Sequence, residues 1–580
     1  MKLKDTFNNI NKVIKRGFKR FPVPMIVSII VGIMVIIKNE LILKSPYNLN
    51  RIILIFALAI PFSLCIKVFF ERYNEKNKYK EAVYYFIEAV FLIFYYYFFL
   101  QKLNFTSITR YVGLSVAFYI GFLFIPYIKR EKQFEMYIIR VFTSLFATAI
   151  YSVVLFIGLA LSLFTINKLL GVNIRASIYY DTLSVVWLMF FPCYFLSNIP
   201  FINEKFKEED YPRGLKILIL YIIIPLIFIY TIILYIYFGK IIITRQWPTG
   251  LVSHLVLWYS ILVVGVLFFV TPIKNGVNWI RKFMIYMPII IVPIMMTMFA
   301  SMGIRVKAYG ITENRYYVII LGIWVLGVML YYIFSKHVKN LNLTIVLFII
   351  IIVSVVGPLS SYSISKYSQN NRLKKVLVKN NMLQNEKIKK APTTISKKDK
   401  SEIISIVGYF NNNHNIQDIK YVPKNFKIKD MKNIFGFNYE EILNYQEEFI
   451  HFVKNPSDKS ININGYDYLF DFTNYYEENA ITNNDIKVIY DEKSSILIVR
   501  LKEKEMYKKD LTVFLDELIK KYGSSIKNDI ISSEDMIFVE ENNKIKIKFV
   551  FNNVSARKDY STNNIRDKNL QFYMLVKIKR

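Results

Sequence analysis

Long apolar runs follow one another from Phe21 to about Ser360, separated by short charged loops. After Ser360 the composition changes to a polar, lysine-rich remainder. A run of about 20 apolar residues matches the roughly 30 Å hydrocarbon core of a bilayer, and a series of such runs does not fit inside one water-soluble domain. The sequence therefore predicts a polytopic, all-α membrane region at the start of the chain.

The apolar runs define roughly eleven transmembrane helices, and the long run at 138–167 leaves the count open between about 10 and 12. These predicted spans cover residues 22–37, 51–69, 82–100, 108–127, 138–167, 177–197, 213–241, 249–272, 283–302, 314–335 and 341–360. Interrupting prolines do not argue against the spans, because neighbouring helices tolerate kinks in a membrane.

Lysine and arginine gather in every second loop, which is the pattern of the positive-inside rule. If the N-terminus is cytoplasmic, the inner segments carry Lys2, Lys4, Lys12, Lys15, Arg16, Lys19, Arg20, Arg72, Lys76, Lys78, Lys80, Lys129, Arg130, Lys132, Lys205, Lys207, Arg213, Lys274, Arg281, Lys282, Lys336 and Lys339. An odd number of spans then places residues 361–580 on the outer side of the cytoplasmic membrane. We expect a cytoplasmic N-terminus and an extracytoplasmic C-terminal domain.

Four segments follow from this organisation. Residues 1–21 form a basic cytoplasmic N-terminus, 22–360 the multi-pass transmembrane domain, 361–400 a membrane-proximal helix and linker, and 401–580 an extracytoplasmic α+β domain. In the last segment, Ile545, Ile547, Phe549 and Phe551 alternate with lysines, as in a strand with one wet face. Strands are also expected at 486–490, 496–501, 536–539 and 572–578, and helices at 401–410, 439–452 and 511–522.

The charge and the motifs exclude several functions. The net charge of +32 would favour nucleic-acid binding in a soluble chain, but most of the excess lies in the first 360 residues, so no nucleic-acid partner is expected. The two cysteines, Cys65 and Cys193, lie in apolar runs and form no CxxC pair. The sequence contains no HExxH, GxSxG or Walker motif. We therefore predict no catalytic residues, no metal site and no cofactor, and the chain is not indicated to be an enzyme.

Glu88 is an ionisable residue inside a predicted span, where a charge costs about 2.5–3.5 kcal/mol on insertion scales. Lys67 of the second predicted span and Arg140 of the fifth lie nearer the same inner interface and could reach toward Glu88. Glu88 is either a carboxylate that couples to protons or ions, or one member of a structural ion pair with these two snorkelling cations. The ion pair is the simpler interpretation.

Charged and aromatic residues gather in the predicted outer loops, where they could bind an anionic headgroup or substrate. The candidate ligand-binding residues are Asp181, Arg245, His254, Arg305, Lys307, Tyr309, Thr312, Glu313 and Arg315. Part of this group also has an ordinary explanation, since Thr312 would cap the following span and Glu313 would lie favourably in its first turn. His254 alone is equally explained as a hydrogen-bonded helix residue.

Several short motifs point to a known family. They are Arg20-Phe21-Pro22, Trp247-Pro248-Thr249-Gly250, Tyr309-Gly310-Ile311-Thr312-Glu313-Asn314-Arg315-Tyr316-Tyr317 and Ser368-Gln369-Asn370-Asn371-Arg372-Leu373. Together they resemble the bacterial membrane-protein family catalogued as domain of unknown function 4153, and the YGxTxxR element is the most specific of them. The resemblance implies a polytopic bacterial protein with an extracytoplasmic C-terminal part, and it implies no established activity.

These observations favour a cell-envelope membrane protein that moves or handles a lipid-linked or small anionic ligand, with Arg245, Glu313 and Arg315 in the binding element. Membrane lipid is the expected partner in that case. The first alternative is a non-catalytic scaffold or sensor whose extracytoplasmic domain binds an envelope protein. The second is an envelope transferase, which would require carboxylates that converge in one outer cavity.

Overall fold

The computed structural model describes most of the chain and divides it into two compact units. The described residues are 12–40, 47–73, 77–128, 133–202, 204–244, 251–392, 395–439, 448–458, 460–473, 480–483, 485–492, 494–502, 504–523, 530–558 and 565–579. The first unit comprises Met1–Lys375 together with Tyr409–Lys420, and the second comprises Val376–Gly408 together with Tyr421–Arg580.

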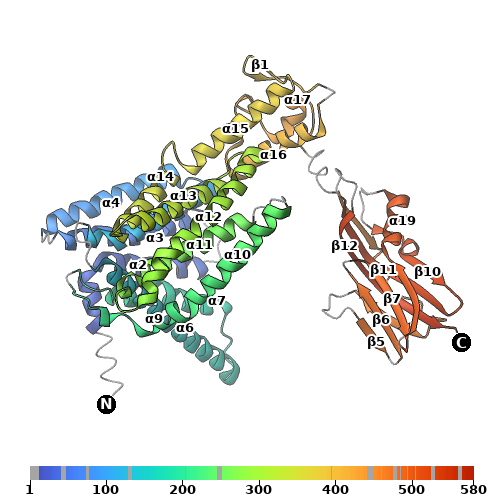
Figure 1. Cartoon of the computed structure of the whole chain (residues 1–580), viewed down its shortest axis with the longest axis horizontal. Helices are drawn as coiled ribbons and strands as arrows, with labels where there is room; N and C mark the ends of the chain where they lie inside the picture. Colours follow the sequence, from blue (N-terminus) through green and yellow to red (C-terminus); the bar gives the residue numbers. More distant parts are fainter. Residues whose placement is uncertain are drawn as a thin grey trace. The chain divides into compact units, whose positions relative to one another are not determined.

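The first unit is a helical bundle (Figure 1). Its helices are α2 (Pro22–Glu40), α3 (Tyr47–Arg72), α4 (Lys78–Phe99), α5 (Phe105–Phe124), α6 (Phe134–Leu170), α7 (Ala176–Ser184), α8 (Phe191–Ser197), α9 (Arg213–Ile217), α10 (Ile224–Thr244), α11 (Leu251–Val270), α12 (Asn278–Tyr309), α13 (Glu313–Phe334) and α14 (Asn340–Val355). Two π-helical turns, Val185–Phe190 and Leu218–Ile223, join α7 to α8 and α9 to α10 into continuous stretches.

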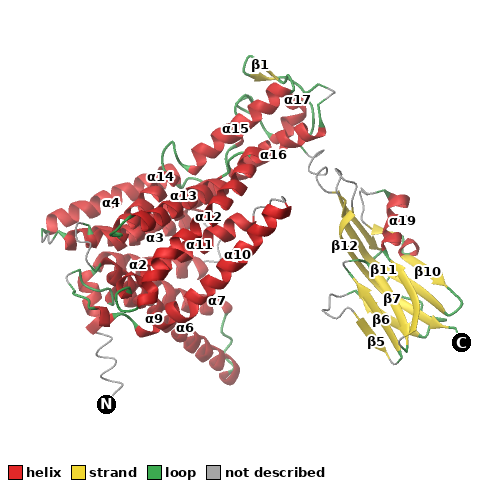
Figure 2. Cartoon of the chain, viewed as in Figure 1, coloured by secondary structure: helices red, strands yellow, loops and turns green. Residues whose placement is uncertain are grey.

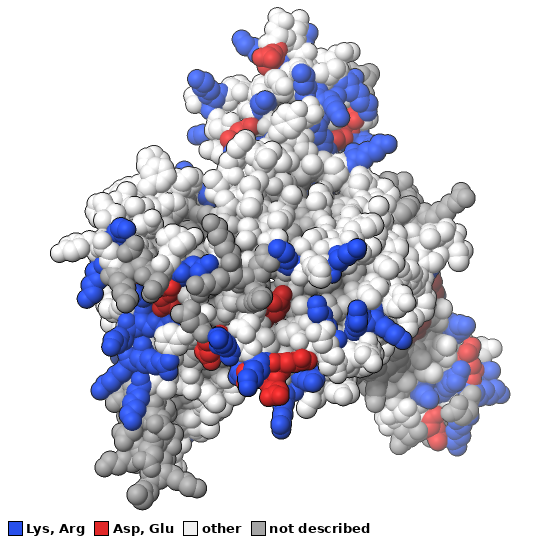
Figure 3. Space-filling model, turned by 60° about the vertical axis from the view of Figure 1, so that its left-hand side comes forward, with Lys and Arg blue, Asp and Glu red and all other residues white. Residues whose placement is uncertain are grey.

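The described helices confirm the predicted polytopic membrane region. Among the described residues, ten helical stretches are long and apolar enough to cross a membrane, and α14 is a shorter apolar helix at the eleventh predicted position. On the face drawn in Figure 3, charged side chains form a band across the lower part of the bundle, and the broad surface above this band is almost free of them. Such a surface suits lipid, which cannot solvate charges. The chain is a multi-pass membrane protein.

Small residues let some of these helices approach closely. Gly113 of α5 lies so near Val355 of α14 that a Cβ atom built on the glycine would overlap the valine side chain. Close backbone approach at small residues is a usual way to pack helices in a bilayer, where no hydrophobic effect drives them together. The α5–α14 contact therefore depends on the missing side chain at position 113.

Three further helices follow the bundle in the sequence. They are α15 (Ser361–Lys379) and α16 (Lys397–Asn413), with the strands β1 (Leu383–Gln384) and β2 (Lys387–Ile388) between them and α17 (Met431–Phe435) after them. Residues 361–375 of α15 and the segment 409–420 belong to the first unit. This return of the chain to the membrane helices builds the site described below.

The remainder of the second unit is mostly β structure (Figure 2). One sheet has the order β4-β12-β11-β3-β9, with β10 paired to β11, and the other has the order β5-β6-β7-β8. The strands are β3 (Glu448–Lys454), β4 (Tyr468–Phe472), β5 (Ala480–Asn483), β6 (Ile486–Asp491), β7 (Ile496–Leu501), β8 (Lys504–Asp510), β9 (Ile530–Ile531), β10 (Ile537–Glu541), β11 (Ile545–Lys558) and β12 (Ile565–Ile578), and the helix is α19 (Thr512–Tyr522).

Alternating residues of β11 confirm the expected strand with one buried face. Ile547, Phe549 and Phe551 are fully buried, and they pack with Phe514 of α19 and Phe572 of β12. The predicted α+β character of the C-terminal part is confirmed, as are the four other expected strands and the helix at 511–522.

The helix expected at 439–452 is wrong at its end, because residues 448–452 form strand β3. Ile450 and Phe452 pair with Ala556 and Val554 of β11 and are buried there. Long-range pairing of this kind overrides a local helical pattern. The remainder of the expected helix, from residue 440 to 447, lies outside the described residues.

Candidate functional site

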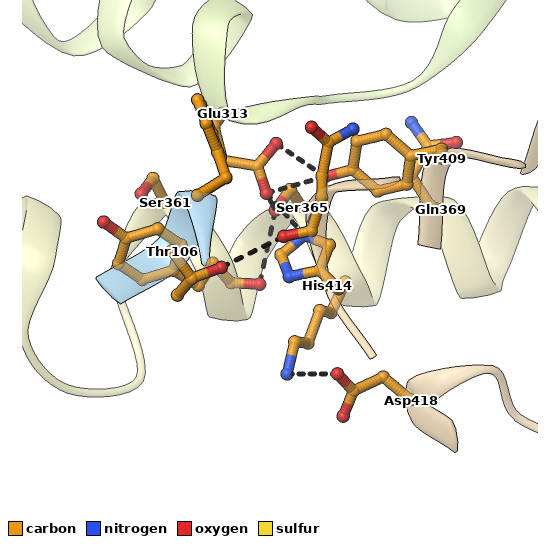
Figure 4. Close-up of polar contacts among 12 residues, drawn as sticks. Thr106, Glu313, Ser361, Ser365, Gln369, Tyr409, His414 and Asp418 are labelled. Carbon is orange, nitrogen blue, oxygen red and sulfur yellow. Dashed lines mark hydrogen bonds and ion pairs between the residues drawn. The ribbon is translucent and has the colours of Figure 1, made fainter. Parts of the chain in front are cut away.

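A buried carboxylate lies at the start of α13 (Figure 4). Glu313 accepts hydrogen bonds from Ser365 Oγ of α15 at 2.7 Å and from Tyr409 Oη of α16, which lies 2.7 Å from each carboxylate oxygen. His414 Nε2 lies 2.5 Å from Glu313 Oε1. Thr312 takes the N-cap position as expected, although its side chain makes no capping hydrogen bond.

His414 is the least usual member of this group. Its side chain is 1% exposed, and its Nδ1 atom has no hydrogen-bond partner. The Glu313 carboxylate can only accept a hydrogen bond, so the Nε2 atom of His414 carries the proton in this contact. Burial and the nearby Glu313 carboxylate raise the pKa of Tyr409, so the phenol stays a hydrogen-bond donor. Ser365, Tyr409 and His414 thus stabilise the negative charge of the buried Glu313 carboxylate.

Polar contacts around this carboxylate fasten the 409–420 segment to the bundle. Thr106 Oγ1 of α5 donates to the carbonyl of Asn413 at 3.1 Å. Lys366 Nζ lies 2.7 Å from Asp418 Oδ2, and Asn370 binds the backbone of Asp418 and Lys420 at 3.0 and 2.7 Å. Buried polar groups need such partners, and here they come from segments about 50 to 300 residues apart.

The turn between α12 and α13 binds α15 as well. Gln369 Nε2 donates to the carbonyls of Tyr309 and Ile311 at 3.0 and 3.1 Å, and the Ile311 N–H donates to Ser368 Oγ at 2.8 Å. Gly310 has a φ of +68° and faces these two side chains closely, so a larger residue would be strained there. The YGxTxxR element and the Ser368-Gln369 motif thus contact each other.

Two arginines flank Tyr309 at this turn. Arg315 Nη1 donates to the carbonyls of Gly310 and Tyr309 at 2.7 and 3.2 Å. The guanidinium carbons of Arg315 and Arg372 lie 5.5 and 6.0 Å from the centroid of the Tyr309 ring, which is 55% exposed. The pair forms an arginine–tyrosine surface next to the buried carboxylate.

The structure brings together only part of the predicted ligand-binding group. Tyr309, Thr312, Glu313 and Arg315 lie in one turn, with Arg305 half-buried and Lys307 exposed on the preceding helix. Elsewhere, Asp181 of α7 accepts a hydrogen bond from Asn39 at 3.3 Å, and His254 is exposed on α11. Arg245 lies outside the described residues.

Sequence reasoning missed most partners of Glu313. Ser365, Tyr409 and His414 were not among the candidates, although the Ser368-Gln369 motif next to Ser365 was noticed as a family feature. Tyr409 and His414 follow a long polar stretch, and no local pattern connects them with a membrane helix. Only the folded chain places them at the carboxylate.

A pocket of about 590 Å³ opens beside this site, between α4, α5, α14 and the start of α15. Its walls are apolar and aromatic, and include Phe91, Phe94, Phe99, Phe118, Ile352 and Val356. Polar groups are contributed by Arg110, Lys366, Ser360 and Ser363. An apolar pocket with a few polar groups is typical of a small-molecule or lipid site.

Arg110 is the most significant of these polar groups. Its Nε donates to the carbonyl of Val355 at 3.3 Å, and its guanidinium lies over the rings of Phe99 and Tyr362, at 4.7 and 5.2 Å from their centroids. No ion pair to Arg110 occurs among the described residues, whereas Lys366 pairs with Asp418. A positive charge therefore faces an apolar pocket, and no carboxylate from the described part of the chain pairs with it.

The expected intramembrane ion pair is wrong. Lys67 Nζ lies 2.9 Å from Glu81 Oε1, and Arg140 Nη2 lies 3.9 Å from Asp210 Oδ1, so neither cation binds Glu88. Glu81 lies about two helical turns nearer the start of α4, where its side chain is 23% exposed, whereas Glu88 is only 4% exposed. Pairing near the interface costs less desolvation than pairing deep in the hydrocarbon.

Comparisons with known proteins agree with the motifs. The family model described as "Domain of unknown function (DUF4153)" matches residues 25–392. An uncharacterized protein of Pasteurella multocida (strain Pm70) is 22% identical over 331 residues, and the alignment covers 56% of this chain and 55% of the relative. The chain thus aligns with about half the length of that relative, and no solved structure matches it. The matched family span includes the whole pocket around Arg110 and, from the buried cluster, Glu313 and Ser365.

Proposed function

Because the chain belongs to the DUF4153 family, whose matched span contains the complete Arg110 pocket, we propose that it binds an anionic amphiphile in that pocket. The ligand has a negatively charged headgroup and an apolar tail, as a phospholipid or a lipid-linked phosphate has. Binding of this kind is the basis for handling or moving a lipid-linked molecule in the cell envelope.

The observation that carries the proposal is the charge of Arg110 in an aromatic pocket. A guanidinium binds phosphate in a two-pronged geometry, and such charge-assisted hydrogen bonds are stronger in a low dielectric. The hydroxyls of Ser360 and Ser363 lie 3.1 Å apart on the same wall, and Ser363 also donates to the carbonyl of Gly357 at 3.2 Å, so a headgroup that binds there would exchange these internal hydrogen bonds for its own. An acyl or polyprenyl chain would then lie against Phe91, Phe94 and Ile352.

The place of the pocket along the helices supports a headgroup at the membrane surface. The pocket is lined by the end of α4, the start of α5, the end of α14 and the start of α15. If the N-terminus is cytoplasmic, these ends face outward, as does the C-terminal domain. Reporter fusions after Lys80 and Arg580 test this threading, which predicts a cytoplasmic signal at the first site and an extracytoplasmic signal at the second.

The binding test uses the full chain purified in a neutral detergent. Native mass spectrometry would compare a diacyl phosphatidylglycerol, a polyprenyl phosphate and a zwitterionic phosphatidylcholine. We expect retention of an anionic lipid, loss of that retention in Arg110→Gln, and little retention of the zwitterionic lipid. The Lys307→Gln variant is the matched control, because it removes an exposed cation from the same end of the bundle without lining the pocket.

The two anionic lipids distinguish the source of the ligand. Preference for the polyprenyl phosphate would indicate a lipid-linked intermediate, and preference for phosphatidylglycerol would indicate a bilayer phospholipid. Equal retention of all three lipids by the wild type and by the folded Arg110→Gln protein would overturn the proposal.

A sensor role is the second candidate, and the buried Glu313 cluster favours it. Tyr409 and His414 both contact the buried carboxylate of Glu313 at the start of α13. A two-state element held by a few buried polar contacts can change its population when a ligand binds. Capture of an envelope protein by the full chain in a pull-down, lost in Tyr409→Phe, with Arg110→Gln neutral for lipid retention, would favour this role.

A further inference from the structure

A second cavity lies in the membrane region between α2, α3 and α4. Its volume is about 820 Å³, and its walls include Val27, Ile55, Phe56, Ala59 and Leu92. Glu88 of α4 is the one residue with an acidic side chain among those that line it. The Glu88 side chain is almost completely buried, at 4% exposed, and its Oε1 atom has no hydrogen-bond partner.

No cation balances this carboxyl group in the described part of the chain. Lys67 of α3, the nearest candidate by sequence, is occupied by Glu81, and Tyr85 also donates to Glu81, at 3.5 Å. The other titratable neighbour on α3 is Cys65, which donates to the carbonyl of Phe118. From α2 the cavity receives only Val23 and Val27, and the backbone of Ser63 is the polar neighbour of the carboxyl.

An unpaired carboxylate is far more costly in such surroundings than a neutral carboxylic acid, because a buried charge without a partner loses its hydration and gains nothing in return. The acid form has an O–H donor as well as an acceptor, so it also suits a site with few partners. We infer that Glu88 is a proton-binding site inside the membrane region, which holds its proton while the cavity is apolar and releases it when water or a cation enters.

This site is independent of the proposed lipid pocket. Arg110 and Glu88 line different cavities, and α4 contributes different residues to each of them. Loss of lipid binding in Arg110→Gln would leave proton binding at Glu88 untouched, and failure of the Glu88 test would leave lipid retention unaffected.

Dicyclohexylcarbodiimide, an apolar reagent, tests the inference on the full chain in membranes. A protonated carboxyl adds across one C=N bond of the carbodiimide: its oxygen bonds to the central carbon, its proton passes to a nitrogen, and rearrangement gives a stable acylurea. Peptide mass spectrometry then locates the adduct. We expect modification at Glu88, a loss of modification as the pH rises, and no adduct at position 88 in Glu88→Gln.

Glu81 is the internal control, since it lies on the same helix and is ion-paired with Lys67. A water-soluble carbodiimide is the second control, and we expect it to leave Glu88 unmodified while it reacts with exposed carboxyls. The wild-type measurement does not depend on whether any variant folds. Absence of an adduct at Glu88 in the folded wild type, or equal modification of Glu81 and Glu88 by the apolar reagent, would overturn the inference.

Discussion

His414 Nε2 and Glu313 Oε1 lie 2.5 Å apart, although 101 positions separate the two residues in the chain. Both side chains are almost completely buried, at 1% and 4% exposed. This contact joins the start of a membrane helix to a segment that follows a long polar stretch. Because the contact is buried and polar, its loss should be felt in the stability of the whole first unit.

Replacement of Glu313 by Ala should destabilise the protein strongly. The change leaves the donors of Ser365, Tyr409 and His414 without an acceptor, and each unsatisfied buried donor costs about 1–3 kcal/mol. Thermal unfolding of the full chain in detergent should show a clear decrease in Tm. Asn314→Ala, at the exposed neighbouring position, is the control and should change Tm little. Equal melting of both variants would show that the cluster adds no stability.

A large side chain at position 113 should disrupt the contact between α5 and α14. Gly113→Leu places atoms where Val355 now lies, and overpacking typically costs about 1–3 kcal/mol. We expect a lower Tm and a smaller monodisperse peak in size-exclusion chromatography. Gly158→Leu is the matched control, because nothing lies within 4 Å of the corresponding Cβ position on α6. If the two variants behave alike, the helices do not approach as closely as described.

Lys67 should be coupled to Glu81 and not to Glu88. In a double-mutant cycle on Tm-derived free energies, Lys67→Met and Glu81→Gln should show a coupling of about 0.5 kcal/mol or more, as residues in contact do. Lys67→Met and Glu88→Gln should instead add to within about 0.5 kcal/mol. A strong coupling between Lys67 and Glu88 would restore the ion pair expected from the sequence.

Asp399 should stabilise the second unit at neutral pH and lose this effect in acid. Its carboxylate is 6% exposed and receives hydrogen bonds from Lys379 at 2.9 and 3.0 Å and from Asn380 at 3.2 Å. Burial opposes ionisation, but these hydrogen bonds outweigh it and lower the pKa of Asp399 below its usual 3.8. The stabilisation is thus complete above the unfolded-state pKa and disappears as the pH falls through the lower folded-state pKa.

Asp399→Asn tests this dependence. Hydrogen bonds to a charged group contribute about 1.5–3 kcal/mol, so the variant should melt earlier than the wild type at pH 7. The difference should shrink as the pH falls below 3.8. A difference that stays constant across this range would mean that the charge of Asp399 contributes nothing.

Local patterns were sufficient for most secondary structure. Alternation around Phe549 and Phe551 predicted β11, and the apolar runs predicted the spans, because both signals lie within a few consecutive residues. The helix expected at 439–452 shows the limit of this reasoning. Whether Ile450 and Phe452 belong to a helix or a strand is decided by β11, roughly 100 residues later.

The candidate site likewise has residues that a local sequence pattern predicts and residues that only the folded chain reveals. Thr312, Glu313 and Arg315 were recognised because they form one short motif, and the structure explains the motif through the turn that Gln369 binds. Arg110 was not recognised, since a single arginine at the start of a span looks like an interfacial anchor. Arg110 becomes a candidate binding residue only because the fold places it against aromatic rings from α4 and α15.

By itself, the sequence determined that the first 360 residues are lipid-embedded helices and that most of the remainder is an α+β domain. Each helix satisfies its own backbone hydrogen bonds, so hydrophobic length alone is decisive there. Tertiary structure alone decided that Lys67 binds Glu81, that Glu88 has no cation partner among the described residues, and that His414 reaches Glu313. Side-chain partners are set by which helix ends meet in space, and that depends on packing between segments whose separation along the chain carries no local signal.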